Sequence, residues 1–211
     1  MPIVNPILHV EKLIMTNKCS SDSAKDQLDA NNDGIDFDVI NDLDVIDDLD
    51  LIDDLDLIDD LDLIDRNFMT QALLLADTAA EHDEVPVGAV VVFEGQVIAS
   101  GYNRPIADHD ASAHAEINAL RAAGKVLGNY RLPECTLYVT LEPCTMCLGA
   151  MVHARIKRLV FAASEPRAGA VESQLALLDQ PFFNHRIEWR GGMLAQESSD
   201  KLKQFFKRRR A

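Results

Sequence analysis

Three residues that ligate metal ions well constrain the fold of this chain most: His114, Cys144 and Cys147. The two cysteines form a Cys-x-x-Cys pair, whereas the histidine lies in a separate segment. One imidazole and two thiolates are three ligands for zinc, and a zinc site with three protein ligands leaves its fourth position to water or substrate. The fold must therefore bring two distant segments together, and we expect the resulting site to be catalytic rather than structural.

The residues around these ligands predict that each segment begins a helix. Pro143 favours a helix entry directly before the cysteine pair. A Cys-x-x-Cys pair at a helix start places both sulfurs on the first turn, where main-chain N–H groups favour thiolates. Glu116 follows His114 by two residues, so at a helix start both side chains can reach one cavity. A carboxylate there can move a proton between water and a substrate, because zinc lowers the pKa of bound water to about 7.

Each of these residues has a plainer interpretation when it is taken alone. The cysteine pair would fit a redox site or half of a structural zinc site, and His114 would fit a buried structural role. Together, His-x-Glu followed by Pro-Cys-x-x-Cys is the signature of zinc-dependent deaminases of nucleobases. Of the other cysteines, Cys135 is expected to fill core space before a strand, and Cys19 has no evident partner. Four cysteines spaced so unevenly do not make a disulfide scaffold.

The N-terminal third differs from the rest of the chain in charge. Residues 1–66 hold 19 acidic and 4 basic residues, a net of −15, which equals the net charge of the whole chain. Residues 42–65 repeat a hexapeptide, Asp-Leu-Asp-Val-Ile-Asp once and then Asp-Leu-Asp-Leu-Ile-Asp three times. A period of six gives a helix no constant face, and aspartate is unfavourable in both helix and strand. We therefore predict a disordered acidic extension over 1–65 and a folded domain over 66–211.

Three alternatives stay open for this extension. It could imitate a phosphate backbone or dock on a partner through its leucines. Its charge could instead fold back on the basic C-terminal end, or translation could start downstream of it. The segment 29–34 matches the first half of an EF-hand loop. However, Ile40 stands where a bidentate Glu is required, so a turn is favoured over a calcium site.

After Arg66 the pattern is that of a globular α/β domain. Apolar residues at helical spacing predict a helix over 68–81, and glycine stops support another over 113–125. β-branched runs predict a strand over 85–93 with a hairpin partner over 96–100. The other expected elements are strands over 136–140, 158–162 and 186–190 and helices over 142–154 and 194–209. Such alternation predicts helices packed on a mixed sheet.

Beyond the zinc motif, residues 67–210 resemble the bacterial tRNA-specific adenosine deaminases, which convert the wobble adenosine of a tRNA anticodon to inosine. The resemblance lies in the stretches EVPVGAV (84–90), NRPI (103–106), AHAEI (113–117), TLYVTLEPC (136–144) and NHR (184–186). It implies a cytidine deaminase-like three-layer sandwich with a central mixed sheet of about five strands. It also implies one Zn²⁺ per subunit on His114, Cys144 and Cys147, a homodimer, and tRNA bound through its anticodon arm. The arginine tRNA is the expected partner.

The same resemblance implies roles for further residues. Activated water would attack C6 of adenosine, and Glu116 would protonate the ring and then the leaving ammonia. Asn103 would contact the flipped base through an amide that both donates and accepts. The Val85 side chain and the Ala115 backbone would line the base pocket. Glu165, in a loop expected to contact the anticodon, stands where the family usually has Asp, so its acceptor chemistry is kept but its reach differs.

The C-terminal run FFKRRR (205–210) combines aromatic side chains with four consecutive cations, which suits base stacking and phosphate contact. From this run we predict that Phe206 and Arg209 bind RNA. The alternative is a helix whose phenylalanines pack inward and whose cations complement the helix dipole.

Other functions fit parts of the pattern. A deaminase of free guanine or cytosine would need the zinc centre but not the basic end. A noncatalytic subunit of an editing dimer would be expected to lack the carboxylate that Glu116 supplies, and a structural zinc module would need a fourth ligand. No apolar run approaches the roughly 20 residues of a membrane span, and residues 1–15 do not resemble a signal peptide. We therefore expect a cytoplasmic protein with no membrane partner.

Overall fold

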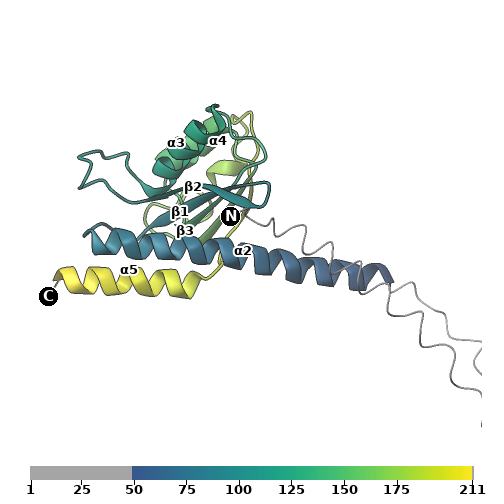
Figure 1. Cartoon of the computed structure of the whole chain (residues 1–211), viewed down its shortest axis with the longest axis horizontal. Helices are drawn as coiled ribbons and strands as arrows, with labels where there is room; N and C mark the ends of the chain where they lie inside the picture. The colour runs from purple at the N-terminus through teal and green to yellow at the C-terminus, as the bar shows by residue number, and fades with distance from the viewer. Residues whose placement is uncertain (1–48, 211) are drawn as a thin grey trace, which may run out of the picture. The chain divides into compact units, whose positions relative to one another are not determined.

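The computed structural model describes residues 49–210, with side chains from residue 60 onward. In this range it has the predicted α/β architecture, a mixed five-stranded sheet between two layers of helices (Figure 1). The expected disorder of the extension up to residue 48 and the EF-hand-like segment 29–34 lie outside the described residues.

The sheet combines an antiparallel hairpin with a parallel half. Its strands are β1 (Gly88–Phe93), β2 (Gln96–Tyr102), β3 (Thr136–Leu141), β4 (Arg158–Ala163) and β5 (Glu188–Arg190). Their order is β2-β1-β3-β4-β5, with β1 antiparallel to both neighbours and β3, β4 and β5 mutually parallel. Because parallel strands end at the same edge, the segments that follow β3 and β4 begin side by side.

Two helices cover each face of the sheet. α3 (Ala115–Leu127) and α4 (Thr145–Ala154) lie on one face, and α2 (Leu49–Glu81) and α5 (Ala195–Arg210) lie on the other (Figure 1). A short 3₁₀ helix, η1 (Leu177–Asp179), precedes β5. Alternate strand residues face opposite layers, so Val91 and Val139 pack with α3 and α4, whereas Val90 and Tyr138 pack with α2.

Helix α2 differs from the prediction. We expected a helix near Phe68 behind a disordered extension, but α2 begins at Leu49 and runs through the later hexapeptide repeats. Extending a helix that is already packed costs much less than nucleating one. Contacts group residues 49–211 into one compact unit, and the domain boundary at residue 66 stays a prediction.

The start of α3 is placed by a close approach to β2. A Cβ on Gly101 would lie 2.4 Å from the carbonyl oxygen of Ala115 and 2.6 Å from the amide nitrogen of Ala119, so only glycine allows this contact. At its other end α3 stops at Gly128, whose φ of 62° is left-handed, as the glycine-stop pattern predicted. No helix among residues 49–210 combines the length and apolar character needed to cross a membrane.

Candidate metal centre and substrate groove

The two predicted helix starts meet and bring the three metal ligands together. His114 is the N-cap residue of α3 and Cys144 that of α4, while Cys147 lies in the first turn of α4. His114 Nδ1 lies 3.7 Å from Cys144 Sγ and 3.5 Å from Cys147 Sγ, and all three ligand atoms lie within 4.8 Å of one another. Tetrahedral zinc with ordinary bond lengths separates such nitrogen and sulfur atoms by roughly 3.6 Å. The donor set and its spacing therefore fit Zn²⁺.

The surroundings of Cys144 favour the thiolate that a metal requires. Hydrogen bonds from the Cys147 thiol and then from His114 lower the pKa of Cys144 to about 3, against the opposing effect of burial. The hydrogen bond to Cys144 raises the pKa of His114 in turn. The hydrogen bond to Cys144 and burial both raise the pKa of Cys147, so in this pair Cys144 is the favoured thiolate.

Glu116 lies in the first turn of α3 and is 4 % exposed. Burial raises the pKa of its carboxyl group, although a hydrogen bond with the Cys147 side chain acts in the opposite direction. A buried carboxyl group with a raised pKa exchanges protons more readily near neutral pH than an ordinary surface glutamate does. The structure therefore places a buried carboxyl group beside the metal ligands, and its role as a proton carrier stays a prediction.

Asn103 lies next to the metal centre, and main-chain groups hold both ends of its amide. Its Oδ1 accepts a hydrogen bond from the Ala115 amide at 2.9 Å, and its Nδ2 donates to the Val85 carbonyl at 3.2 Å. An amide has two N–H donors and two acceptor lone pairs, so one of each remains for a ligand. Asn103 therefore joins the two residues expected to line the base pocket, and its contact with a base stays a prediction.

A groove of about 540 Å³ runs from the ends of β3 and β4 to α5. It brings together three residues that we predicted to bind substrate: Val85, Glu165 and Phe206. The Glu165 carboxylate is turned back on its own loop, where it accepts a hydrogen bond from the Arg167 amide at 2.9 Å. Its longer side chain therefore helps to shape this loop in addition to lining the groove.

Two other predicted substrate residues lie elsewhere. Ala115 is fully buried and its amide donates to Asn103, so its backbone lies beside the metal centre and not in this groove; its place in the base pocket stays a prediction. Arg209 donates to the Asp83 carbonyl and stacks over the Phe205 ring, with 5.0 Å between Cζ and the ring centroid. The two interpretations of the C-terminal run thus apply to different residues, because Phe205 packs inward whereas Phe206 is 44 % exposed.

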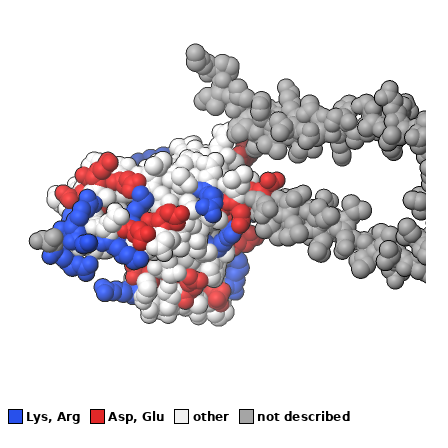
Figure 2. Space-filling model, turned by 90° about the horizontal axis from the view of Figure 1, so that it is seen from below, with Lys and Arg blue, Asp and Glu red and all other residues white. Residues whose placement is uncertain are grey.

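The groove also contains cations that the residue-by-residue prediction missed. Arg167 comes from the loop after β4, and Lys203 and Arg210 come from α5. Lys and Arg side chains gather at the C-terminal end of α5 (Figure 2). For Arg210 the signal in the sequence was the basic run itself. Lys203 and Arg167 lie outside that run, and the packing of α5 and of the loop after β4 on the sheet brings them to the groove.

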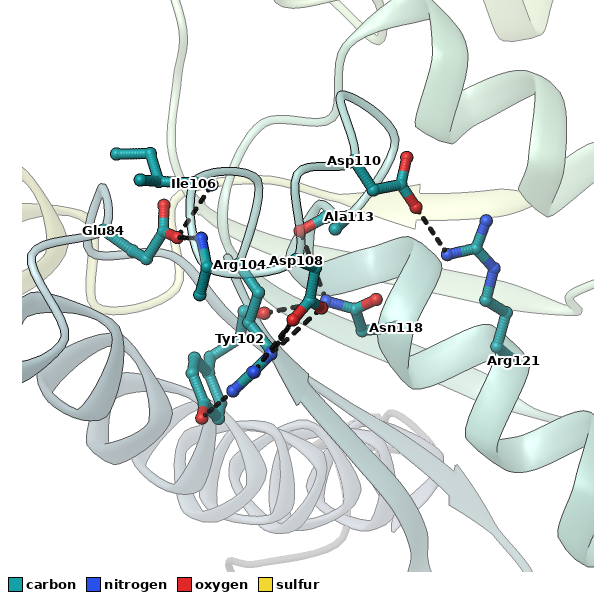
Figure 3. Close-up of polar contacts among 10 residues, drawn as sticks. Glu84, Tyr102, Arg104, Ile106, Asp108, Asp110, Ala113, Asn118 and Arg121 are labelled. Atoms are coloured by element: carbon teal, nitrogen blue, oxygen red, sulfur yellow. Dashed lines mark hydrogen bonds and ion pairs between the residues drawn. The ribbon is translucent and has the colours of Figure 1, made fainter.

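Two buried glutamates that the sequence analysis did not single out hold loops beside the site. Glu84 is 2 % exposed, and its Oε1 accepts hydrogen bonds from the Ile106 and Ala107 amides at 2.9 and 2.8 Å (Figure 3). Glu142 is 3 % exposed and accepts main-chain hydrogen bonds from the loop after β4. Both residues lie within stretches that carry the family resemblance, but nothing in those stretches indicated a buried carboxylate.

Comparisons with known proteins agree with this geometry. Residues 63–163 match the family model of the cytidine and deoxycytidylate deaminase zinc-binding region. The tRNA-specific adenosine deaminase of Haemophilus influenzae is 52 % identical over 143 residues, which are 67 % of this chain and 83 % of the relative. A solved structure from a study of A-to-I editing by tRNA:A34 deaminases is 48 % identical with a TM-score of 0.63, covering 64 % of this chain and 99 % of the other. A guanine deaminase structure from Nitrosomonas europaea is 28 % identical with a TM-score of 0.55, covering 66 % and 83 %.

Proposed function

Because the chain belongs to the tRNA-specific adenosine deaminase family, we propose that it converts the wobble adenosine of a tRNA anticodon to inosine by zinc-dependent hydrolysis. The observation that carries this proposal is a His-Cys-Cys centre with a buried carboxylate beside a groove that contains Arg167, Lys203 and Arg210. A free base offers no phosphates to such cations, whereas an RNA strand does.

The reaction replaces the amino group on C6, so that adenosine and water give inosine and ammonia. His114, Cys144 and Cys147 would hold the zinc ion. When bound, zinc supplies Lewis-acid activation of water at neutral pH. Glu116 takes a proton from the attacking water, delivers it to the ring nitrogen beside C6, and then transfers a proton to the leaving ammonia. The remaining donor and acceptor of Asn103 hold the edge of the purine.

The groove accommodates the nucleotides that flank the reacting adenosine. Phe206 offers an exposed aromatic face for base stacking, and the groove cations neutralise phosphates. We propose the anticodon arm of the arginine tRNA as the bound element. A tRNA substrate also supports the cytoplasmic location that we propose.

We also propose that the enzyme is a homodimer. A second groove, about 630 Å³ in volume, lies between α3 and α4 and is lined largely by apolar residues that include Ile117, Leu120 and Ala150. A second copy of the chain would cover this apolar surface. Light scattering after gel filtration should give twice the mass of one chain for the wild type and the mass of one chain for Ala150→Arg. A monomeric wild type at micromolar concentration would contradict the dimer.

Purified zinc-loaded protein tests the catalytic proposal directly. It should form inosine in an arginine tRNA with adenosine at the wobble position, measured by chromatography of the nucleosides after digestion. The same tRNA with guanosine at that position should give none. Free adenosine, cytidine and guanine serve as competing substrates. Turnover of a free base without turnover of the tRNA would overturn the proposal.

A further inference from the structure

Glu142 connects Leu141 of β3, which lines the groove, to the turn that carries the metal ligand Cys144. It is the first residue after β3 and comes directly before Pro143 and the zinc ligand Cys144. Its side chain is 3 % exposed and points into the loop 165–173, which follows β4. The start of this loop forms one wall of the groove, with Glu165 and Arg167 among the lining residues.

The carboxylate of Glu142 accepts five hydrogen bonds from this loop. Its Oε1 accepts hydrogen bonds from three consecutive main-chain amides, those of Val171, Glu172 and Ser173, at 3.1, 2.9 and 3.0 Å. Its Oε2 accepts one from the Glu165 amide at 2.9 Å and another from the Ser173 hydroxyl. One side chain therefore joins the two ends of the loop.

The loop is also joined to the zinc-ligand turn itself. The Ala170 amide donates to the Pro143 carbonyl at 2.9 Å, and Cys144 and Gly169 form an isolated antiparallel bridge. Gly169 packs directly against the carboxylate, since a Cβ on it would lie 2.2 Å from Glu142 Oε2. Any side chain at position 169 would displace the Glu142 carboxylate.

We propose that Glu142 is a positioning residue that fixes the 165–173 loop in its RNA-binding conformation and couples it to the turn that carries Cys144. The part of this inference that concerns RNA rests on the proposed function. Glu142 touches neither the metal ligand atoms nor the groove, so its effect passes through the loop. The cations and acceptors of the groove wall keep their places because the carboxylate satisfies the loop's main-chain amides.

The test compares the full-length zinc-loaded wild type with Glu142→Gln. This variant has the same size, but one acceptor oxygen becomes an amide group that faces N–H donors. Hydrogen exchange of the peptide 164–174 should accelerate by about tenfold or more, and KM for tRNA should rise by a similar factor. We expect kcat to change by less than about threefold and the zinc content to stay at one ion per chain.

Two further variants separate positioning from general destabilisation. Gly169→Ala places a methyl group where the Glu142 carboxylate lies, so it should also accelerate hydrogen exchange of 164–174 and raise KM. The double variant with Glu142→Gln should show no larger change in either quantity than Glu142→Gln alone. Glu84→Gln makes the same chemical change in the other buried glutamate and should accelerate exchange of the 104–108 segment instead of 164–174. If Glu142→Gln does not fold, Ser173→Ala, which removes only the hydroxyl donor, gives the same comparison in milder form.

Three results would overturn the proposal. The first is unchanged exchange of 164–174 and unchanged KM in Glu142→Gln. The second is loss of zinc and kcat at unchanged KM, which would assign Glu142 to the metal. The third is an equal acceleration of exchange in all peptides. A wild type that does not deaminate tRNA would contradict the proposed function, while hydrogen exchange and zinc content would still test the coupling.

Discussion

Asp65, the last residue of the last hexapeptide repeat, forms a bidentate ion pair with Arg158 at the start of β4. Its carboxylate oxygens lie 2.7 and 2.6 Å from the two terminal guanidinium nitrogens, and the Tyr138 hydroxyl donates to it at 2.8 Å. Asp65 is only 1 % exposed. An acidic repeat that looks like a solvated tail in the sequence therefore supplies a buried contact between α2 and the sheet.

Removing the charge of Asp65 should destabilise the fold. Asp65→Asn leaves the guanidinium of Arg158 without its ionic partner. We expect the free energy of unfolding to fall by about 3 kcal/mol, the lower end for a buried pair, because the Arg158 side chain is 26 % exposed. Asp60→Asn changes an exposed aspartate of the same repeat and should stay within about 0.5 kcal/mol of the wild type. Urea unfolding followed by circular dichroism measures both. Equal effects of the two substitutions would show that the buried pair contributes nothing specific.

Of the residues before Asn67, the last hexapeptide repeat, residues 60–65, should be enough to give the domain the stability of the full chain against urea. Among the repeat residues with described side chains, Asp62 and Asp65 form ion pairs with the domain, through Arg190 and Arg158. A chain that starts at Asp60 keeps both pairs, whereas one that starts at Asn67 loses both. We expect the first to unfold at the urea concentration of the full chain and the second to unfold earlier. If both truncated chains match the full chain, the ion pairs do not stabilise the domain.

The residues before Asp60 allow a test of the fold-back hypothesis. If their negative charge competes with RNA for the basic end of α5, the full chain should bind tRNA more weakly than the chain that starts at Asp60. This difference should shrink as salt is added, because screening weakens repulsion between exposed charges. Fluorescence anisotropy with labelled tRNA at low and moderate salt measures it. Equal affinities at low salt would exclude the competition.

Glu116→Gln should abolish turnover without removing the metal. The amide keeps the size of the side chain but cannot carry a proton, so we expect kcat to fall by roughly 10²–10⁴-fold. Zinc should stay at one ion per chain, since Glu116 is not among the three ligand residues. Metal analysis and inosine formation are measured on the same preparation. Wild-type turnover by this variant would show that another group carries the proton.

Zinc removal should abolish activity reversibly, and only the ligand cysteines should be required for zinc binding. A strong chelator should inactivate the wild type, and added Zn²⁺ should restore it. Cys144→Ala removes one ligand and should lose both metal and activity. Cys135→Ala is the matched control, because Cys135 is buried outside the ligand group and should leave the zinc content unchanged. Retention of tightly bound zinc by Cys144→Ala would contradict its assignment as a ligand.

Much of the fold and the metal centre could be predicted from local patterns. The hairpin of β1 and β2, the glycine stop of α3 and the two helix starts each depend on residues that are close together in the chain. Cys135 also lies in the core as expected. The structure brings Val85, Glu165 and Phe206 together in one groove, and the binding of substrate by these residues, Ala115 and Arg209 stays a prediction.

The three metal-ligand residues and the carboxylate predicted to carry the proton could be found in short segments of the sequence, because each lies at the N-cap or in the first turn of a helix. Which acidic residues become buried could be decided only by the tertiary structure. Asp65, Glu84 and Glu142 look like ordinary surface acids in the sequence, and their partners are an arginine far along the chain or main-chain amides that no sequence pattern displays. A buried carboxylate is stable only when such partners surround it, and folding alone brings them together.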